Sequence, residues 1–452
     1  MTYLFAVTGN LALASVSGLF FIFLAISSFK EKALRAGALS LVFLAATAVF
    51  WTLLILSAPT WLNLTVLLLS GGFILLSMLR FFLHPIPPRD LSQAVSYDER
   101  DHMFARNNLK YHPDLAESYY RQYPERRSHD HQIHNKPDFG DPRQVYHDPY
   151  TTPGYEAAFE YLHQTIPASM GAPAPVPQPV AIKKIRAVIK DLVHFYGGGD
   201  AGFAIVDPAY YYSRKGRRAA DWGKSINPSH HWAVVIVLPM AIEMIRHSPT
   251  ATVIQESARK YVEAAKISNI VAGYLRRFGY PARAHNDGNY EVLYVPLAVA
   301  AGLGELGRMG LFMHHRFGPC VRLAVVTTTL DLADSAPPET TYMARFCRIC
   351  KKCAVNCPSG SIASGEEPES RGFHHWSIVQ EKCFSFWKTI GSDCGMCIAV
   401  CPFTKPDTLV HRLVRWYVRR NSLNQFIALF MDDLLYGRRK KIARTNPVPF
   451  FR

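Results

Sequence analysis

Eight of the nine cysteines of this chain lie in one 55-residue stretch that ends at Cys401. Their spacing is C-x2-C-x2-C-x3-C-P, then a single cysteine, then C-x2-C-x3-C-P, and the members are Cys347, Cys350, Cys353, Cys357, Cys383, Cys394, Cys397 and Cys401. A [4Fe–4S] cluster needs four converging thiolates, and three cysteines at C-x2-C-x2-C spacing supply three of them. The pattern therefore predicts a ferredoxin-like module with two [4Fe–4S] clusters, which we place at residues 336–410.

The ligand sets follow from the way two-cluster ferredoxins use these motifs. In those proteins the cysteine before the proline serves the other cluster. We expect one cluster on Cys347, Cys350, Cys353 and Cys401, and the second on Cys357, Cys383, Cys394 and Cys397. A zinc site would leave surplus cysteines, and a disulfide framework is not expected without a secretory context. The ninth cysteine, Cys320, is expected to be a small buried side chain.

Three apolar segments near the N-terminus are each long enough to cross about 30 Å of hydrocarbon. They are residues 5–29, 37–57 and 61–83, and they predict a three-helix membrane anchor over residues 1–84. A cleaved signal peptide is the alternative for the first segment. That segment lacks a basic start, an A-x-A cleavage site and a twin arginine, so the anchor is favoured.

The charges beside these segments predict their orientation. Lys30, Lys32 and Arg35 lie between the first two segments, whereas the short second loop has no charge. Because basic loops face the cytoplasm, the N-terminus is expected outside and everything after residue 84 inside, at the inner (cytoplasmic) membrane. A reducing compartment suits thiolates that hold iron–sulfur clusters.

Two polar segments flank the central part of the chain. Residues 85–180 are expected to be a solvated segment and linker, with a metal site at His129, His131 and His134 as the alternative. Residues 411–452 are basic and amphipathic, in a chain with a net charge of +15. We expect this end to contact anionic lipid or an acidic electron donor such as a ferredoxin or flavodoxin, with no nucleic acid partner; a solvated helix packed over the cluster module is the alternative.

Residues 181–335 have the alternation of helix and strand typical of an α/β domain. Apolar spacing predicts a helix from residue 182, strands at 201–206, 232–240 and 321–328, and an amphipathic helix at 254–278. The glycine-rich stretch 301–310 contains G-x-G-x-x-G. A helical run rather than a strand precedes it, so a dinucleotide site is only weakly indicated.

Three blocks of this region resemble the reductive dehalogenases. They are GYLRRFGYPA, VPLAVAAGLGELGRMGL and HRFGPCVRLAVVTT, followed by the cysteine motif. The resemblance covers roughly residues 180–405 and implies a nitroreductase-like, corrinoid-binding domain joined to the cluster module. The chain resembles the membrane-fused, cytoplasm-facing variety. It departs from the family at TTLDL, where many members read TDLPL, and at Val325, where some carry a lysine.

The resemblance also implies a set of site residues. It implies a base-off cobalamin without a protein ligand, and no D-x-H-x-x-G motif for such a ligand is found. The glycines expected at the cofactor are Gly302, Gly304, Gly307 and Gly310. The expected proton donor is Tyr261, with Arg322 or Arg308 as the cation that lowers its pKa and Asn286 as a hydrogen-bond donor. A core tyrosine, a brace for the glycine turn and a turn residue are the ordinary alternatives for Tyr261, Arg308 and Asn286.

The activity that the resemblance implies is the two-electron removal of halide from an organohalide, which we expect to be aromatic. An epoxyqueuosine reductase-like enzyme is the first alternative. The second is a membrane electron-transfer subunit that binds no corrinoid. A ferredoxin, a flavodoxin or a quinol-linked protein is expected to donate the electrons.

Overall fold

The computed structural model describes residues 1–79, 96–332, 341–370 and 373–440. It consists of two compact units, Met1–Ile86 with Lys405–Lys440 and Pro87–Thr404 with Lys441–Arg452. Residues 411–440 of the predicted C-terminal segment are therefore grouped with the membrane anchor, and residues 441–452 lie outside the described residues.

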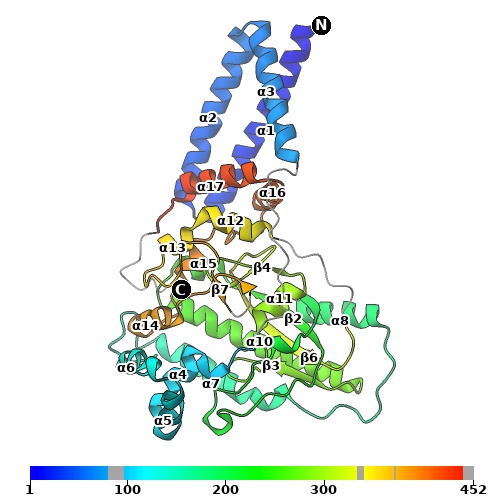
Figure 1. The fold of residues 1–452 in the computed structure, drawn as a ribbon. Helices are drawn as coiled ribbons and strands as arrows, with labels where there is room; N and C mark the ends of the chain where they lie inside the picture. Colours follow the sequence, from blue (N-terminus) through cyan, green and yellow to red (C-terminus); the bar gives the residue numbers. More distant parts are fainter. Residues whose placement is uncertain (80–95, 333–340, 371–372, 441–452) are drawn as a thin grey trace. The chain divides into compact units, whose positions relative to one another are not determined.

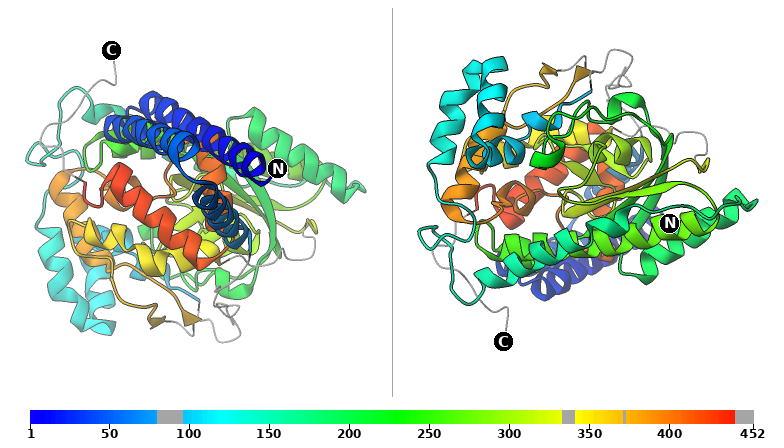
Figure 2. Two further views of the ribbon diagram at one scale, coloured as in Figure 1. Left: turned by 90° about the horizontal axis from the view of Figure 1, so that it is seen from above. Right: turned by 90° about the horizontal axis from the view of Figure 1, so that it is seen from below.

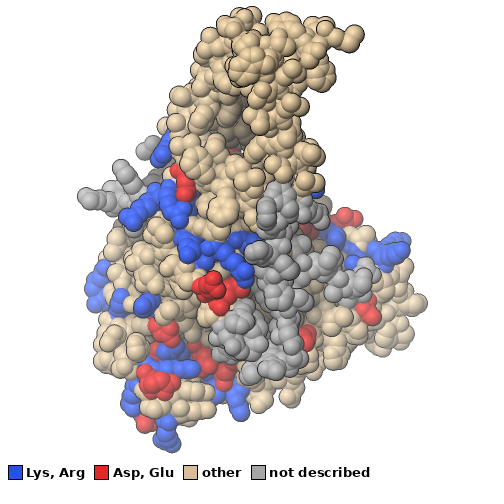
Figure 3. All heavy atoms as spheres, turned by 45° about the horizontal axis from the view of Figure 1, so that its top comes forward, with Lys and Arg blue, Asp and Glu red and all other residues tan. Residues whose placement is uncertain are grey.

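The first unit contains the three predicted apolar helices, α1 (Thr2–Lys30), α2 (Leu34–Ser57) and α3 (Thr60–Met78), which lie side by side (Figure 1). Each is long and apolar enough to cross a membrane, and residues 80–83 of the third predicted segment lie outside the described residues. In Figure 3 the column that they form is tan, without charged side chains along most of its length. Polar contacts join these helices. The Asn10 Nδ2 donates to the Asn63 Oδ1 at 2.9 Å, and the Trp51 Nε1 donates to the Ser17 Oγ at 3.1 Å.

Two further helices, α16 (Leu409–Val418) and α17 (Ser422–Tyr436), complete this unit. Their buried sides join the ends of α1 and α2 in a small core made by Leu24, Ala36, Val410 and Leu435.

The second unit is built on a four-stranded sheet in the order β1-β2-β6-β3. Its strands are β1 (Asp200–Ile205), β2 (Trp232–Pro239), β6 (Val321–Thr328) and β3 (Ala282–His285). All three pairings are antiparallel, with Val235 opposite Val325 at the centre. Three of these strands match the sequence predictions, and the short β3 was not predicted.

Helices cover both faces of this sheet (Figure 2). Because successive side chains of a strand point to opposite faces, Val234 and Ile236 of β2 pack with α8 (Ile182–Phe195) and α10 (Thr252–Arg277). Val235 and its alternate neighbours pack instead with α11 (Tyr294–Ala300). Both predicted helices, α8 and α10, are confirmed.

The expectation of a solvated segment at residues 85–180 is wrong for residues 99–169, whereas residues 170–180, expected to be a linker, form no helix or strand. Four α helices form within residues 99–169, α4 (Met103–Asn108), α5 (Pro113–Gln122), α6 (Arg127–His134) and α7 (Thr152–Gln164). They enclose a buried ion pair of Arg106 and Asp130, whose side chains are 2% and 0% exposed and whose Nη2 and Oδ1 lie 2.6 Å apart. The Nη1 of Arg106 also reaches Glu381 at 2.5 Å. Such pairing brings polar residues inside, which composition alone does not reveal.

The three histidines of that segment do not form a metal site in this structure. They lie on or beside α6, and the His134 Nε2 is 3.0 Å from the carbonyl oxygen of Arg106. Among the described residues, no three His, Cys, Asp or Glu side chains come close enough to hold a single metal ion.

The cysteine motifs lie on short helices separated by tight turns. The helices are α12 (Tyr342–Cys350), α13 (Lys352–Val355), α14 (Gln380–Ile390) and α15 (Met396–Ala399). Left-handed residues break them between cysteines, Lys351 with φ 55° and Gly395 with φ 63°. At Gly395 a Cβ would lie 2.7 Å from the Ser248 Oγ, so the turn before Cys397 requires glycine.

Candidate functional site

The predicted cluster cysteines gather in two groups. Cys401 lies within electrostatic reach of Cys347, Cys350 and Cys353, although it follows them by about fifty residues. The three are separated from Cys401 by the whole of α14, so only the fold brings them together. This first group also lines a small cavity with Phe346 and Phe403.

The second group surrounds Cys397. Its thiol interacts electrostatically with Cys394, Cys383 and Cys357, and also with Cys353 of the first group. The two groups are therefore neighbours, as the crossed ligand sets of two-cluster ferredoxins require.

Burial makes most of these thiols poor thiolates by themselves, whereas hydrogen bonds from Ser359 and Ser361 lower the pKa of Cys357. Burial raises the pKa of Cys383 to about 12 and that of Cys353 to about 11. Burial also raises the pKa of Cys397 and Cys401, with neighbouring cysteines adding to the effect. A bound metal cluster reverses this balance because its cationic iron stabilises thiolate. The donor set, soft sulfur in a buried pocket, therefore fits iron–sulfur clusters.

Arg308 lies beside the first group of cysteines and is 2% exposed. Its guanidinium donates to the carbonyl oxygens of Cys347, Ala363 and Gly365 at 3.0, 2.9 and 2.6 Å, and it stacks over the Trp376 ring at 4.4 Å. The structure thus places Arg308 at the cluster module and away from Tyr261.

The four glycines of the 301–310 stretch build a hairpin, and none of them lines the large cavity described below. The hairpin pairs β4 (Gly304–Leu306) with β5 (Phe312–His314). Gly302 and Gly310 have φ values of 70° and 68°. A Cβ at Gly304 or Gly307 would lie 2.0 or 2.2 Å from atoms of Met313. Positive φ accounts for Gly302 and Gly310, and close packing within the hairpin accounts for Gly304 and Gly307.

A cavity of about 600 Å³ opens between the sheet, the N-terminal helices and the cysteine-bearing loops. Aromatic rings dominate its lining, among them Phe104, Phe139, Phe159, Tyr290, Tyr294 and Trp387. Asp393 and Ile398 line it too, and each is next to a predicted cluster ligand in the chain. One wall of the cavity is therefore the cluster module itself.

Tyr261 and Arg322 meet on one side of this cavity. The side chain of Arg322 lies on the α10 face of β6, since Ala324 and Val326, two and four residues on, belong to the core on that face. Its guanidinium carbon is 5.0 Å from the centre of the Tyr261 ring.

Two residues that the sequence did not single out hold Arg322 in place. Its Nη2 donates to the Ser257 Oγ at 2.5 Å and to the Asp393 Oδ2 at 2.8 Å, and Ser257 also donates to Asp393 at 2.5 Å. Ser257 precedes Tyr261 by one helical turn, so both face the same strand. Nothing in the local pattern around Asp393 pointed to this role, except its position directly before a cluster cysteine.

The electrostatics of this group favour a protonated tyrosine. Burial raises the pKa of Tyr261 to about 12, while the nearby charge of Arg322 acts to lower it. Burial also raises the pKa of Asp393, against the lowering effects of Arg322 and the Ser257 hydrogen bond. Tyr261 can therefore carry a proton into the cavity at any ordinary pH.

Asn286 lines the same cavity at the end of β3. Its Oδ1 accepts from the Ser268 Oγ at 2.7 Å and its Nδ2 donates to the Asn269 Oδ1 at 3.0 Å. Both partners lie on α10. The structure thus brings Tyr261, Arg322 and Asn286 to one cavity and separates Arg308 and the four glycines from it.

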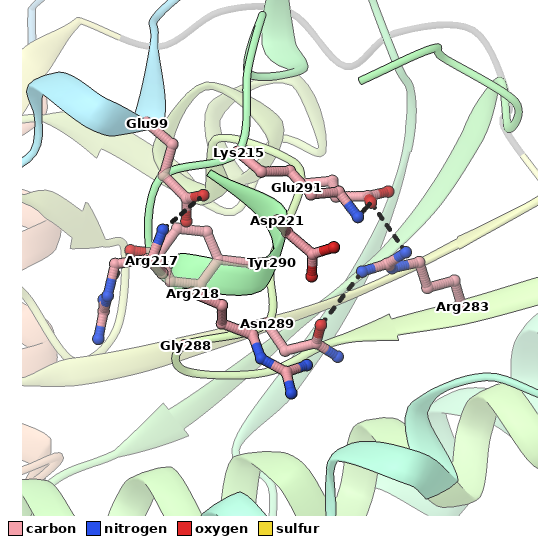
Figure 4. Close-up of a pocket in the computed structure, with 10 residues that line it drawn as sticks. All are labelled: Glu99, Lys215, Arg217, Arg218, Asp221, Arg283, Gly288, Asn289, Tyr290 and Glu291. Atoms are coloured by element: carbon pink, nitrogen blue, oxygen red, sulfur yellow. Dashed lines mark hydrogen bonds and ion pairs between the residues drawn. The ribbon is translucent and has the colours of Figure 1, made fainter. Parts of the chain in front are cut away.

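A smaller charged pocket shares Arg217 and Tyr290 with the large cavity. Figure 4 shows its residues, among them Lys215 and Arg283, which converge on Glu291. The two ion pairs measure 2.8 and 2.9 Å. The Arg217 Nη1 donates to the Tyr290 hydroxyl at 3.1 Å. The hydrogen-bonded pair of Arg217 and Tyr290 therefore lies between the charged pocket and the large cavity.

The lining of the large cavity suits part of a corrinoid by its chemistry. Ligand pockets are lined mainly by apolar and aromatic side chains with a few polar groups, and apolar rings suit the face of a flat macrocycle. Two lining residues, Tyr294 and Trp387, have a buried hydroxyl and a buried indole N–H without a hydrogen-bond partner among the described residues. Such groups cost about 1–3 kcal/mol each, so a ligand with amide side chains would have partners here.

The fold and the cysteine groups together define an iron–sulfur protein in which a ferredoxin-like module borders a large cofactor-sized cavity. The model of the 4Fe-4S dicluster domain matches residues 346–405. Over 82% of this chain and 52% of the other, the fold agrees with the catabolic reductive dehalogenase NpRdhA, with a TM-score of 0.63 and 22% identity.

Sequence relatives agree with this fold. The chain is 36% identical over 206 residues to the tetrachloroethene reductive dehalogenase of Desulfitobacterium hafniense, covering 43% of this chain and 37% of that protein. It is 34% identical over 218 residues to the enzyme of that name from Sulfurospirillum multivorans, covering 46% and 43%. The matched region thus spans about two fifths of these relatives. The predicted resemblance to the reductive dehalogenases is confirmed for this region of the sequence and for the fold.

Proposed function

We propose that this protein is a membrane-anchored reductive dehalogenase. The reaction replaces a carbon–halogen bond by a carbon–hydrogen bond, consumes two electrons and one proton, and releases a halide ion. The observation that carries the proposal is the meeting of Tyr261 and Arg322 on a cavity that is also walled by the cysteine-bearing loops. The proton donor and the source of electrons then face one substrate space.

We assign the proton to the hydroxyl of Tyr261. A phenol that delivers its proton becomes a phenolate, and a cation beside the ring stabilises that charge. Arg322 is that cation, at 5.0 Å from the ring, and Ser257 and Asp393 keep its guanidinium oriented. Asn286 is the proposed hydrogen-bond donor to the substrate, with its amide held by two residues of α10.

The cofactors proposed for this site are one base-off corrinoid and two [4Fe–4S] clusters on the crossed cysteine sets. When bound, they supply a reduced cobalt centre that cleaves carbon–halogen bonds and a relay that carries single electrons to it. The rings of Phe104, Tyr294 and Trp387 would contact the corrinoid or the substrate and keep water out. Water exclusion strengthens the interaction between Arg322 and a developing phenolate.

We infer an aromatic organohalide as the substrate. The supporting observation is the lining of the cavity, in which aromatic side chains predominate and offer stacking partners for a flat ring. One of the structures that share the fold, that of NpRdhA, was determined with 3-bromo-4-hydroxybenzoic acid. Relatives named for tetrachloroethene make chlorinated alkenes the competing class.

The orientation proposed for the anchor has the N-terminus outside and the second unit in the cytoplasm. Within the first unit, α16 and α17 pack at the end where α1 leads into α2. That end carries the exposed basic side chains of the unit, which are Lys30, Lys32, Arg35, Arg412, Arg419, Arg438 and Arg439. Residues 1–29 and 36–79 have no Lys or Arg, and basic ends face the cytoplasm. A ferredoxin, flavodoxin or quinol-linked protein remains the proposed electron donor.

The experiment that tests the proposal compares three purified full-length proteins. They are the native chain, Tyr261→Phe, and the control Tyr274→Phe, which changes a tyrosine of the same helix that packs on the sheet core and does not line the cavity. Each is reconstituted anaerobically with iron, sulfide and cobalamin and assayed with halogenated phenols and with tetrachloroethene under a chemical reductant. We expect about one corrinoid and about eight irons per chain in all three, and turnover reduced at least about 100-fold only in Tyr261→Phe.

Two outcomes would contradict it. Equal turnover in Tyr261→Phe and in the native chain would remove this tyrosine from the mechanism. About eight irons without corrinoid, under conditions in which another reductive dehalogenase takes up cobalamin, would indicate an electron-transfer subunit instead.

A further inference from the structure

The two C-terminal helices of the first unit carry apolar stripes that face away from their own core. On α16 the stripe is Leu409, Leu413 and Trp416, which are 55%, 48% and 42% exposed. Spacings of four and three residues put these side chains on one face of the helix. Large apolar residues exposed together on one face mark an interaction surface.

The second stripe lies on α17 and has the same character. Leu423, Phe426 and Phe430 follow each other by three and four residues and are 36%, 58% and 66% exposed. The opposite side of this helix is buried through Asn424, Gln425 and Leu435. Both helices are thus anchored by one face and expose an apolar face on the other.

Hydrogen bonds tie these helices to the ends of the apolar column. The side-chain amide of Asn421 donates to the carbonyl oxygens of Leu76 and Leu79 at 3.1 and 2.9 Å, and that of Asn424 donates to Ser77 at 2.8 Å. These are the last carbonyls of α3, which have no partner within their own helix. The end of α3 is therefore capped by α17.

A second tie involves a buried acid at the end of α1. His411 of α16 lies 2.8 Å from the Glu31 carboxylate through its Nε2, and the two side chains are 7% and 5% exposed. Ser27 of α1 donates to the same carboxylate at 2.9 Å. Contacts with the ends of α1 and α3 therefore fix the position of α16 and α17 at one end of the apolar helices.

Basic side chains flank the apolar stripes. Arg412 and Arg419 are exposed on α16 next to its stripe, and the Arg420 guanidinium lies 4.4 Å above the Trp416 ring. Arginine beside an indole is typical of the boundary between hydrocarbon and headgroups, because the ring suits the boundary and the cation suits phosphate. In Figure 3 basic side chains gather where the uncharged column ends.

We propose that α16 and α17 lie in the membrane interface, with both apolar stripes inserted among the acyl chains and the flanking arginines bound to anionic phospholipid headgroups. The argument is continuity, since these stripes extend the apolar surface of α1–α3 at its end, and charge complementarity with anionic lipid. The proposal rests on the membrane anchoring proposed above. The two helices would then form a lipid-binding surface of the first unit.

Tryptophan quenching tests the insertion with the full chain in nanodiscs. Phosphatidylcholine brominated on the acyl chains near the glycerol is compared with the unbrominated lipid for the native protein, Trp416→Phe and Trp51→Phe. The fluorescence lost on each substitution isolates one residue. We expect the brominated lipid to remove roughly half or more of the Trp416 contribution, as expected for a ring at the headgroup boundary.

The control residue separates the two hypotheses. Trp51 lies within α2, so its quenching reports the anchor alone. Quenching of Trp51 without quenching of Trp416 would overturn the interfacial assignment and leave the anchor intact. Absence of quenching at both would overturn the anchor as well.

Lipid retention tests the charge. The native protein, the double variant Arg412→Gln/Arg419→Gln and the control double variant Lys183→Gln/Lys184→Gln, which removes two exposed charges from α8, are extracted from mixed phosphatidylcholine and phosphatidylglycerol. We expect the arginine variant alone to lose about half of its bound phosphatidylglycerol, more so at low ionic strength where charges act over longer distances. Equal retention by all three proteins would refute the headgroup site.

Discussion

Replacement of Arg308 by leucine should release one iron–sulfur cluster although Arg308 is not a ligand. The guanidinium of this residue is 2% exposed and donates to three main-chain carbonyls, one of which belongs to Cys347. It therefore joins the β4–β5 hairpin to both ends of the segment that carries the first four cysteines. Leucine fills part of the volume but donates to none of the carbonyls.

The size of the effect follows from these contacts. Leaving the buried Cys347 carbonyl without its donor costs about 1–3 kcal/mol. Ala363 and Gly365 are exposed, so water can replace the guanidinium at their carbonyls and these two losses are smaller. The lost stacking of a buried cation on Trp376 adds about 2 kcal/mol. The two effects together cost about 3–5 kcal/mol. Since a folded domain is stable by only about 5–15 kcal/mol, a loss of this size is enough to open the segment locally. Arg308→Lys, which keeps the charge and reaches fewer carbonyls, should lie between leucine and the native residue.

The assay is the iron and sulfide content of anaerobically purified full-length protein, together with its thermal midpoint. We expect about eight irons per chain in the native protein and about four in Arg308→Leu. The matched control is Arg348→Leu, which changes an arginine of α12 that is 47% exposed and paired with Glu367 at 3.5 Å; exposed pairs contribute about 0–1 kcal/mol. Full iron content and an unchanged midpoint in Arg308→Leu would refute the bracing role.

Three further predictions concern the cavity and the N-terminal helices. Ser257→Ala removes a hydrogen bond worth about 1.5–3 kcal/mol from the Arg322 guanidinium, so kcat should fall about tenfold or more at constant KM; an unchanged kcat would contradict the positioning role. Because burial raises the pKa of Tyr261 to about 12, the phenol stays protonated below that pH and proton donation is lost only as the pH rises through about 12. A pH profile of kcat should therefore be flat from about 7 to 10. A decline with a midpoint near 10 would show a tyrosine with an unshifted pKa. Arg106→Met leaves the Asp130 carboxylate buried without its partner and should lower the free energy of unfolding by about 3–5 kcal/mol, with partial recovery in Arg106→Met/Asp130→Leu; denaturation of the native and variant proteins measures both values, and a loss below about 1 kcal/mol would contradict the buried pair.

Elements with local signals were predictable from the sequence. The helices α8 and α10 and the strands β2 and β6 follow from the spacing of apolar residues, which depends only on helical and strand periodicity. The gathering of eight cysteines into one module was predictable because a cluster demands a particular spacing of its ligands along the chain. The lengths of α1–α3 follow in the same way from the thickness of a bilayer.

The N-terminal helices were missed because their stabilising contacts are distant in sequence. Arg106 pairs with Asp130, 24 residues away, and with Glu381, 275 residues away. From composition and periodicity alone, two charged residues in a polar segment are predicted to be exposed to solvent. The pairing that makes their burial possible is a property of the folded chain.

The candidate site was predictable in part. The resemblance brought forward Tyr261, Arg322 and Asn286, and the structure places all three on one cavity. It also brought forward Arg308, which braces the cluster module instead. The position of an arginine in a sequence motif does not reveal whether its guanidinium points to a substrate space or to main-chain carbonyls.

The sequence by itself determined which groups the chain could bind and where it could cross a membrane. Both depend on local features, which are eight cysteines at ferredoxin spacing and three apolar segments. The tertiary structure alone decided which charges meet. Arg322 reaches Asp393 across 71 residues and Ser257 across 65, and α16 and α17 join the helices at the other end of the chain. Spacing along a chain sets which residues share a face within a few turns, whereas contacts between distant segments depend on how whole faces pack, and that is settled only when the chain folds.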